Sequence, residues 1–204
     1  MFHVEHFDDI DIPSSVREKF EIYKALLFKW QRAINLVSDN SLDDFWCRHI
    51  ADSLQIMPYI RGRKVLDVGS GGGFPGMVLA ITGKFDVTCV DSDSRKMMFL
   101  SEIARQTNTN VTLLTERIEN VAVTDFDTVC ARGFSGLKNL IKITADKSGY
   151  GVFLKGAKIA EEIREAQKLY DFTYELYPSK TDPSGHIITV SVERDKCHKS
   201  STSR

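Results

Sequence analysis

The chain has 204 residues and is nearly neutral, with 27 basic and 28 acidic side chains and a net charge of −1 at pH 7. This length is typical of one domain with a small extension. The charge excludes a protein that is basic over its whole surface, so RNA binding would need a local basic face. The longest apolar runs are too short to span a bilayer, and the start lacks the pattern of a signal peptide. We therefore expect a cytoplasmic protein with no membrane partner.

The four cysteines, Cys47, Cys89, Cys130 and Cys197, lie far apart and form no C-x-x-C pair. This spacing supports neither a metal site nor a disulfide framework. Cys89 and Cys130 fall in apolar, strand-like runs, where a thiol acts as a small hydrophobic side chain. We therefore expect a reduced protein without a metal.

Residues 1–60 are predicted to form an N-terminal helical extension. Ser15-x-x-Glu18 has the spacing of a capping box. Apolar residues then recur at steps of three and four over residues 16–34, which is typical of one face of a long helix. The pattern over residues 41–54 predicts a second helix. Together these helices would cap the domain that follows.

Strand and helix patterns alternate over residues 61–193, the predicted catalytic domain. Strands are expected at 64–68, 85–90, 111–114, 126–131, 151–155, 172–177 and 186–192, and helices at 75–82, 94–106, 136–145 and 157–169, with a weak turn near 116–120. Near-continuous apolar strands indicate a parallel sheet covered on both faces, and the last two strands, joined without a helix, should form an antiparallel hairpin. The pattern predicts an α/β fold of the class I methyltransferase type: a Rossmann-like, seven-stranded, mostly parallel sheet with an antiparallel last strand. The polar tail, residues 194–204, is expected to be disordered.

A glycine-rich turn follows the first predicted strand, within residues 64–76. Gly71-x-Gly73-x-x-Gly76 matches the spacing of dinucleotide-binding loops, in which the backbone approaches an anion at a helix N-terminus. The pattern favours an adenosine-bearing cofactor, although a similar turn also serves simply to close a tight connection. Asp67, just before the turn, either contacts such a ligand or caps the N–H groups of the loop.

The second strand ends in Asp91, where a carboxylate can accept both hydroxyls of a ribose. Its alternative role is to cap the following helix, because residues 91–94 are rich in N-cap types. A dehydrogenase would ordinarily add an acid–base residue from a second domain, and no second domain fits here. S-adenosylmethionine needs only one half-site, and we therefore expect it as the cofactor.

The fourth strand ends in Arg132, which cannot remove a proton at neutral pH. The Asn/Asp-Pro-Pro-aromatic run of amine methyltransferases is absent, and Cys130 in its apolar strand is better explained as a core thiol than as a nucleophile. An acceptor with a free lone pair and no proton to lose, such as a purine ring nitrogen, would suit Arg132. Catalysis would then be mainly in-line positioning. The alternative is that Arg132 forms a surface ion pair.

Basic residues that would contact RNA are dispersed along the chain. The candidates are Arg48, His49, Arg61, Arg63, Lys64, Arg132, Lys138, Lys155 and Lys158. Dispersed charges are usually solvated, and they form a phosphate-binding surface only if several meet at the carboxyl edge of the sheet. His49 is flanked by apolar residues and is equally explained as a half-buried, hydrogen-bonded side chain.

Several longer motifs resemble the RsmG (GidB) family. They are Trp30…Asn35-Leu36-Val37-Ser38, Arg48-His49-Ile50-x-Asp52-Ser53-Leu54, Leu66-Asp67-Val68-Gly69-Ser70-Gly71-x-Gly73-Phe74-Pro75-Gly76, Val90-Asp91-Ser92…Phe99-Leu100, Arg117-Ile118-Glu119 and Leu154-Lys155-Gly156. The resemblance covers about residues 16–192. It implies transfer of a methyl group from S-adenosylmethionine to the N7 atom of one guanine in small-subunit (16S) ribosomal RNA, with that RNA or the small ribosomal subunit as partner.

The same resemblance implies roles for individual residues. Gly69 and Phe74 would contact the cofactor in the loop, Ile118 and Glu119 would flank its adenine, and Asp91 would hold its ribose. Arg132 would lie beside the methionine end or the incoming base and is the expected catalytic residue. Arg48, His49 and Lys155 are weaker candidates for RNA contacts. Two features depart from the family pattern: Gly133 stands where the family more often has Ala, and the serine-rich tail is additional.

Two other functions remain open at this stage. One is a non-catalytic adenosine- or RNA-binding module that keeps the loop without turnover. The other is a methyltransferase for a protein or a small molecule. We expect the protein to act as a monomer.

Overall fold

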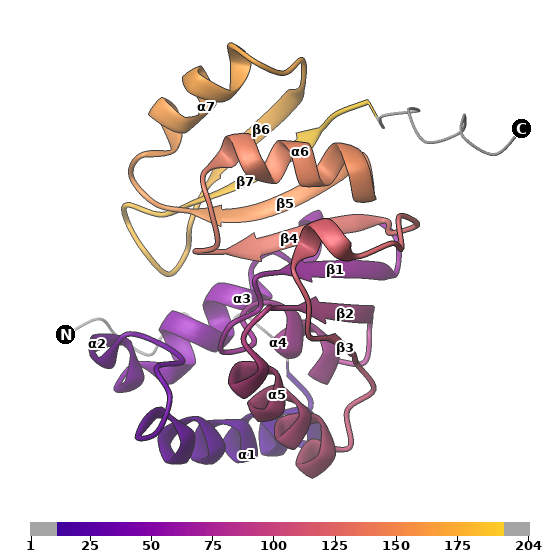
Figure 1. Ribbon diagram of the computed structural model, residues 1–204. Helices are drawn as coiled ribbons and strands as arrows, with labels where there is room; N and C mark the ends of the chain where they lie inside the picture. The colour runs from indigo at the N-terminus through magenta and orange to yellow at the C-terminus, as the bar shows by residue number, and fades with distance from the viewer. Residues whose placement is uncertain (1–11, 194–204) are drawn as a thin grey trace, which may run out of the picture.

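The computed structural model describes residues 12–193 (Figure 1). The prediction for the tail, and that for the first eleven residues, lie outside this range. A seven-stranded sheet in the order β3-β2-β1-β4-β5-β7-β6 forms the centre of the molecule. Its strands are β1 (Lys64–Val68), β2 (Asp86–Val90), β3 (Thr112–Leu114), β4 (Thr128–Arg132), β5 (Tyr150–Lys155), β6 (Thr173–Pro178) and β7 (His186–Ser191). Each lies within two residues of its predicted place.

The strand directions match the prediction. β1 pairs in parallel with β2 and β4, and β3 and β5 extend the parallel sheet on either side. β7 runs antiparallel between β5 and β6. A short loop joins β6 to β7, and a parallel pair would need a much longer crossover. The fold prediction is therefore confirmed.

Helices cover both faces of the sheet, in two separate apolar cores (Figure 1). One face carries α1 (Ser14–Gln31), α4 (Gly76–Ile81) and α5 (Ser94–Thr107), and the other carries α6 (Leu137–Lys147), α7 (Ile159–Gln167) and the short turn η4 (Ile118–Asn120). Side chains along β1 alternate between the two cores, as the two-residue period of a strand requires: Val65 belongs to the first core and Leu66 to the second. No helix within residues 12–193 is long and apolar enough to cross a membrane.

The N-terminal segment differs from its prediction in two respects. The capping box is wrong: α1 begins at Ser14, with Pro13 as its N-cap and no side-chain cap bond. The second helix, expected over residues 41–54, is broken into α2 (Asp39–Leu42), the π-helical turn η2 (Trp46–Ala51) and α3 (Asp52–Leu54), and the 3-10 turn η3 (Met57–Tyr59) follows. Apolar periodicity does not distinguish a π-turn from an α-helix, because both place residues three to five apart on one face. π-Turns often occur at functional sites, and this one carries His49.

Candidate active site

The carboxyl ends of β1, β2 and β4 meet at one edge of the sheet. β1 lies between β4 on one side and β2, the next strand along the chain, on the other. The direction in which strands are added to the sheet therefore reverses at β1. Ligands of open α/β sheets bind at such a switch point, in the crevice beyond the strand ends. Three hollows line this edge, and the residues singled out from the sequence lie around them.

The glycine-rich loop after β1 is built as the sequence requires. Gly69, Gly71 and Gly73 have φ values of +68°, +53° and +95°, a region that residues with side chains rarely adopt. A Cβ on Gly69 would lie 2.0 Å from the ring of Phe134, so that position has no room for a side chain. The buried hydroxyl of Tyr23 donates a hydrogen bond to the carbonyl of Gly72, which fixes the loop against α1.

Asp67 supports this loop from below. Its side chain is fully buried, and its Oδ2 accepts the N–H of Gly76 at 3.1 Å, at the start of α4. Burial raises the pKa of the Asp67 carboxyl to about 6, against the opposing effect of hydrogen bonds from Ser70 and Gly76. Asp67 therefore caps the loop, which is the second of the two roles that the sequence left open.

The first hollow, of about 100 Å³, lies beyond β2 and brings together four predicted donor-binding residues: Gly69, Asp91, Ile118 and Glu119. Asp91 accepts the N–H of Gly71 on Oδ2 and the N–H of Asp93 on Oδ1, both at 2.9 Å. Each carboxylate oxygen keeps a further lone pair for a hydroxyl.

The second hollow, of about 340 Å³, lies above the glycine loop. It shares Gly69, Asp91 and Phe134 with the first hollow and adds Phe74, Lys96 and Arg132. The ring of Phe74 is buried and stacks on Tyr23 at 5.2 Å and on His49 at 4.6 Å between centroids. Sequence reasoning missed Lys96 and Phe134. Both follow a predicted site residue by a few positions, Lys96 in the first turn of α5 and Phe134 just after Arg132, and that proximity is the signal that was available.

The residues around these two hollows fit S-adenosylmethionine. Beside Gly71, which lines the second hollow, a Cβ would meet only the carbonyl oxygen of Gly69, at 3.7 Å, so a ligand has room to lie directly on the main chain there. Asp91 offers acceptors for ribose hydroxyls, and Ile118 gives an apolar wall for a purine ring. Lys96 and Arg132 bring positive charge to the second hollow, as a carboxylate requires.

Arg132 lies at the end of β4, on the border between the second hollow and the third. Its Nη1 forms an ion pair with Asp52 at 3.0 Å and donates to the carbonyl of Arg48 at 2.8 Å. Its guanidinium carbon is 4.7 Å from the centroid of the Phe74 ring, which is within cation–π distance. The ion pair considered from the sequence therefore exists, and with the Arg132 side chain only 20% exposed it lies inside the crevice instead of on the open surface.

His49 is buried beside Arg132, with its Nδ1 3.0 Å from Nη2 of the guanidinium. A guanidinium only donates, so Nδ1 accepts and the ring proton is on Nε2. Burial, with the nearby charges of Arg132 and Arg48, lowers the pKa of His49 to about 3. The ring is neutral at physiological pH. Its burial and its hydrogen bond agree with the second explanation of His49 considered from the sequence, a side chain held inside the protein.

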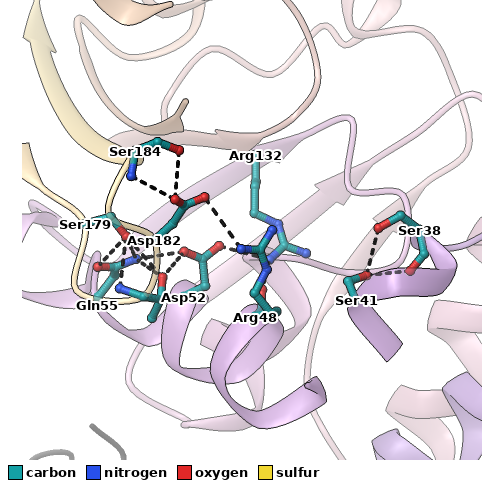
Figure 2. Close-up of polar contacts among 10 residues, drawn as sticks. Ser38, Ser41, Arg48, Asp52, Gln55, Arg132, Ser179, Asp182 and Ser184 are labelled. Carbon is teal, nitrogen blue, oxygen red and sulfur yellow. Dashed lines mark hydrogen bonds and ion pairs between the residues drawn. The ribbon is translucent and has the colours of Figure 1, made fainter. Parts of the chain in front are cut away.

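The third hollow, of about 520 Å³, is lined by Arg48, Asp52, Arg132 and Asp182, among others. Figure 2 shows Asp52 and Arg48 between Arg132 and the loop that joins β6 to β7. The Arg48 side chain is 49% exposed and pairs with Asp182 at 3.6 Å. This hollow is therefore polar and charged, and it opens next to the donor cavity.

The other basic candidates are placed differently. Lys155 pairs with Glu162 at 2.7 Å and donates to the carbonyl of Ser135, and its side chain is only 11% exposed. Arg63 and Lys64 form ion pairs at the amino end of β1, with Asp86 and Asp125 respectively. That end is the edge of the sheet opposite the three hollows.

Cys130 is buried in β4, and its thiol donates to Oδ1 of Asp67 at 3.8 Å. Burial raises the pKa of this thiol well above its ordinary value, which keeps it protonated and unreactive. Within residues 12–193, no group of three or more His, Cys, Asp or Glu side chains is arranged to hold a metal ion.

Comparison with known proteins agrees with the geometry of the site. Residues 16–186 match the model of the GidB family, described as rRNA small subunit methyltransferase G. The chain belongs to this family. It is 43% identical over 187 residues to the ribosomal RNA small subunit methyltransferase G of Rhodospirillum rubrum, an alignment that covers 89% of this chain and 93% of the relative. The protein of the same name from Rickettsia felis is 39% identical over 186 residues, covering 89% and 96%.

Solved structures with the same fold are more distant in sequence. The magnesium protoporphyrin IX methyltransferase of Synechocystis PCC 6803, solved with bound SAM, superposes with a TM-score of 0.58 at 13% identity and covers 89% of this chain and 98% of its own. The ribosomal protein L11 methylase of Lactobacillus delbrueckii also gives 0.58, at 18% identity, and covers 70% and 77%. These likenesses show the class I methyltransferase fold. The GidB-family member described here therefore belongs to a family of small-subunit rRNA methyltransferases, and the residues around its first two hollows fit S-adenosylmethionine as the methyl donor.

Proposed function

We propose that this enzyme methylates the N7 atom of a guanine in 16S rRNA, with the donor in the first two hollows and the base in the third. The observation that carries this assignment is the position of Arg132, whose side chain lines both the second and the third hollow. A single group on that border touches both the methyl donor and the acceptor. Membership of the GidB family supplies the class of RNA.

We propose that Gly69, Asp91, Ile118 and Glu119 bind the adenosine part of the donor. Phe74 and Arg132 line the hollow above the glycine loop and would bind its methionine part. S-adenosylmethionine supplies an electrophilic methyl group on a sulfonium. The residues of this chain orient it and exclude water from it, because positioning and desolvation are what an in-line transfer requires.

Among the described residues that line the third hollow, each candidate base is committed to another contact. A guanidinium such as that of Arg132 only donates hydrogen bonds, and Nδ1 of His49 already accepts from it. Asp52 is held in the ion pair with Arg132, and Asp182 pairs with Arg48. The N7 atom of guanine carries a lone pair and no proton, so its methylation needs no base. The chemistry of the site therefore favours a ring nitrogen over an exocyclic amine.

Of the weaker RNA candidates, Arg48 has the exposure that a phosphate contact needs. His49 and Lys155 are mostly buried in contacts of their own, and we propose that they support the RNA site by holding Arg132 and the chain after β4. We further propose that the enzyme works in the cytoplasm as a monomer.

A methyl-transfer assay tests the proposal. Purified enzyme and labelled S-adenosylmethionine are incubated with small subunits, or with naked 16S rRNA, from cells that lack the enzyme, and digested RNA is analysed for 7-methylguanosine. We expect label in one guanine. Absence of transfer to either RNA would favour a non-catalytic module, label in protein or a small molecule would change the substrate, and calorimetric binding of NAD in place of S-adenosylmethionine would overturn the donor.

The role of Arg132 is tested by the variant Arg132→Ala. The control is Arg63→Ala, which also removes an ion-paired arginine but at the opposite edge of the sheet. We expect Arg132→Ala to lower turnover about 100-fold, while the Kd for S-adenosylmethionine rises by a much smaller factor, because Lys96 also brings positive charge to that hollow. Arg63→Ala should leave both unchanged. A variant that loses only donor binding would assign Arg132 to the methionine end alone.

A further inference from the structure

Asp52 is the point at which three distant segments of the chain meet. Its Oδ2 accepts from Nη1 of Arg132 at 3.0 Å, at the end of β4. Its Oδ1 accepts from the hydroxyl of Thr181 at 2.7 Å and from Nε2 of Gln55 at 2.8 Å. The side chain is only 16% exposed. Oδ2 therefore has its partner at the active site, while Oδ1 has its partners in Gln55 and in Thr181, which lies on the loop before β7.

Asp52 is the only carboxylate among the described residues that forms an ion pair with Arg132. The other direct contacts of Arg132 are to neutral groups: the carbonyl of Arg48, the Nδ1 of His49 and the ring of Phe74. The buried carboxyl of Asp67 interacts with Arg132 without contacting it. All hydrogen bonds of the guanidinium are charge-assisted, but only the bond to Asp52 joins two opposite charges. This bond therefore has the largest part in keeping the guanidinium over Phe74, between the donor cavity and the third hollow.

The loop over residues 179–185 is held by the same short stretch of chain. Gln55 accepts the N–H of Lys180 on Oε1 at 2.8 Å and donates from Nε2 to the hydroxyls of Ser179 and Thr181, at 3.1 Å and 3.2 Å. In Figure 2 this loop lies against Gln55 and Asp52, on the side of Asp52 away from Arg132. The loop also forms a wall of the third hollow, through Thr181 and Asp182.

We propose that Asp52 is a positioning residue that couples the docking of loop 179–185 to the orientation of Arg132. With the loop docked, the Thr181 hydroxyl and Gln55 hold Oδ1, so Oδ2 is turned toward the guanidinium. With the loop undocked, the carboxylate is free to rotate and Arg132 loses its fixed partner. Docking of the loop therefore completes the wall of the acceptor hollow and, at the same time, fixes Arg132, which faces the methyl donor. This inference rests on the proposed function, because it concerns the same acceptor site.

Asp52→Asn tests the coupling with little change of volume. Whichever way the amide is turned, either Arg132 or Gln55 faces an NH2 group. We expect kcat to fall about 30-fold, with the KM for S-adenosylmethionine within about twofold of the wild-type value. Glu102→Gln removes a carboxylate from an Arg pair on α5, away from the hollows, and should leave kcat unchanged.

A double-mutant cycle separates positioning from general damage to the fold. If Asp52 acts through Arg132, Asp52→Asn should cost less than about threefold in an Arg132→Ala background, where Asp52 has no guanidinium to hold. An equal loss in both backgrounds, or a loss that appears only in the affinity for S-adenosylmethionine, would overturn the proposal. The wild-type enzyme must transfer methyl to 16S rRNA in the same assay, and failure there would refute the proposed function and not the coupling.

Thr181→Val tests the contact of the loop with Asp52, and it decides whether the coupling exists even if the Asp52→Asn variant does not fold. It leaves the bond between Asp52 and Arg132 in place and removes the hydroxyl that donates to Asp52 and also meets Gln55 and Ser179. We expect faster hydrogen exchange at the amide of Lys180 and a fall of about fivefold in kcat. Faster exchange with wild-type kcat would show that the loop and Arg132 are independent, and the coupling would be wrong.

Discussion

Replacement of Asp67 by Asn gives a sharp test of how the glycine loop is supported. The Asp67 carboxyl is fully buried on the strand that leads into the loop, and burial raises its pKa from 3.8 to about 6. A raised pKa in the folded state means that its contribution to stability is fully present below pH 3.8 and is lost as the pH rises through about 6. The folded protein therefore carries a buried negative charge at neutral pH at a cost in stability.

The two pKa values set the size of the effect. Relative to the protonated form, ionisation of Asp67 destabilises the fold by about 2 kcal/mol near pH 5 and by about 3 kcal/mol near pH 8. Asparagine is nearly isosteric, accepts the same N–H of Gly76 and does not titrate. We expect the stability of Asp67→Asn, measured against the wild type, to rise by about 1 kcal/mol between these two pH values.

Urea unfolding of both proteins at the two pH values measures this difference. The contributions of groups that titrate alike in both proteins, His49 among them, cancel in the comparison. Asp86→Asn is the control, because it makes the same substitution at a side chain that is 61% exposed. A stability difference for Asp67→Asn that stays constant or shrinks with pH would refute the argument from burial. Calorimetry should also show that the variant binds S-adenosylmethionine about as tightly as the wild type, since Asp67 lies beneath the loop.

Two further predictions concern the same loop. Tyr23→Phe leaves the buried carbonyl of Gly72 without its donor, so we expect about 1–2 kcal/mol of lost stability in urea unfolding and weaker donor binding by calorimetry; unchanged values would mean that the hydroxyl does not fix the loop. Gly69→Ala combines a positive φ with a collision against Phe134, and should abolish donor binding. Gly83→Ala, where φ is +70° and nothing lies within 4 Å of a Cβ, is the control for backbone strain alone and should keep donor affinity.

The N-terminal segment marks one limit of sequence reasoning. Residues 41–54 have helical periodicity, and the structure breaks them into two short α-helices around a π-turn. The pattern identifies the buried face correctly, because Ile50 and Leu54 are buried. It does not reveal the break, which brings His49 against Arg132 and Phe74. Contacts with a strand end more than 80 residues away have no trace in local periodicity.

Roles of polar residues mark the other limit. Asp67 and Asp91 each had two interpretations in the sequence. Burial decides the case of Asp67, which lies beneath the loop. Asp91 accepts two backbone N–H groups and also lines two of the hollows, so its contact with a ribose stays a prediction. Lys155 and Arg48 looked alike as dispersed basic residues. In the structure Lys155 is buried against Glu162, and Arg48 is half exposed beside the third hollow.

The sequence by itself determined the order of the elements, the direction of the strands and the nature of the loop. These follow from apolar periodicity, from connection lengths and from glycines that must adopt positive φ, all of which are local properties. Only the tertiary structure decided which side chains meet. The ion pair of Asp52 with Arg132 and its bond to Thr181 join residues from α3, β4 and the β6–β7 loop. Such contacts depend on burial and on the packing of distant segments, and no spacing along the chain encodes them.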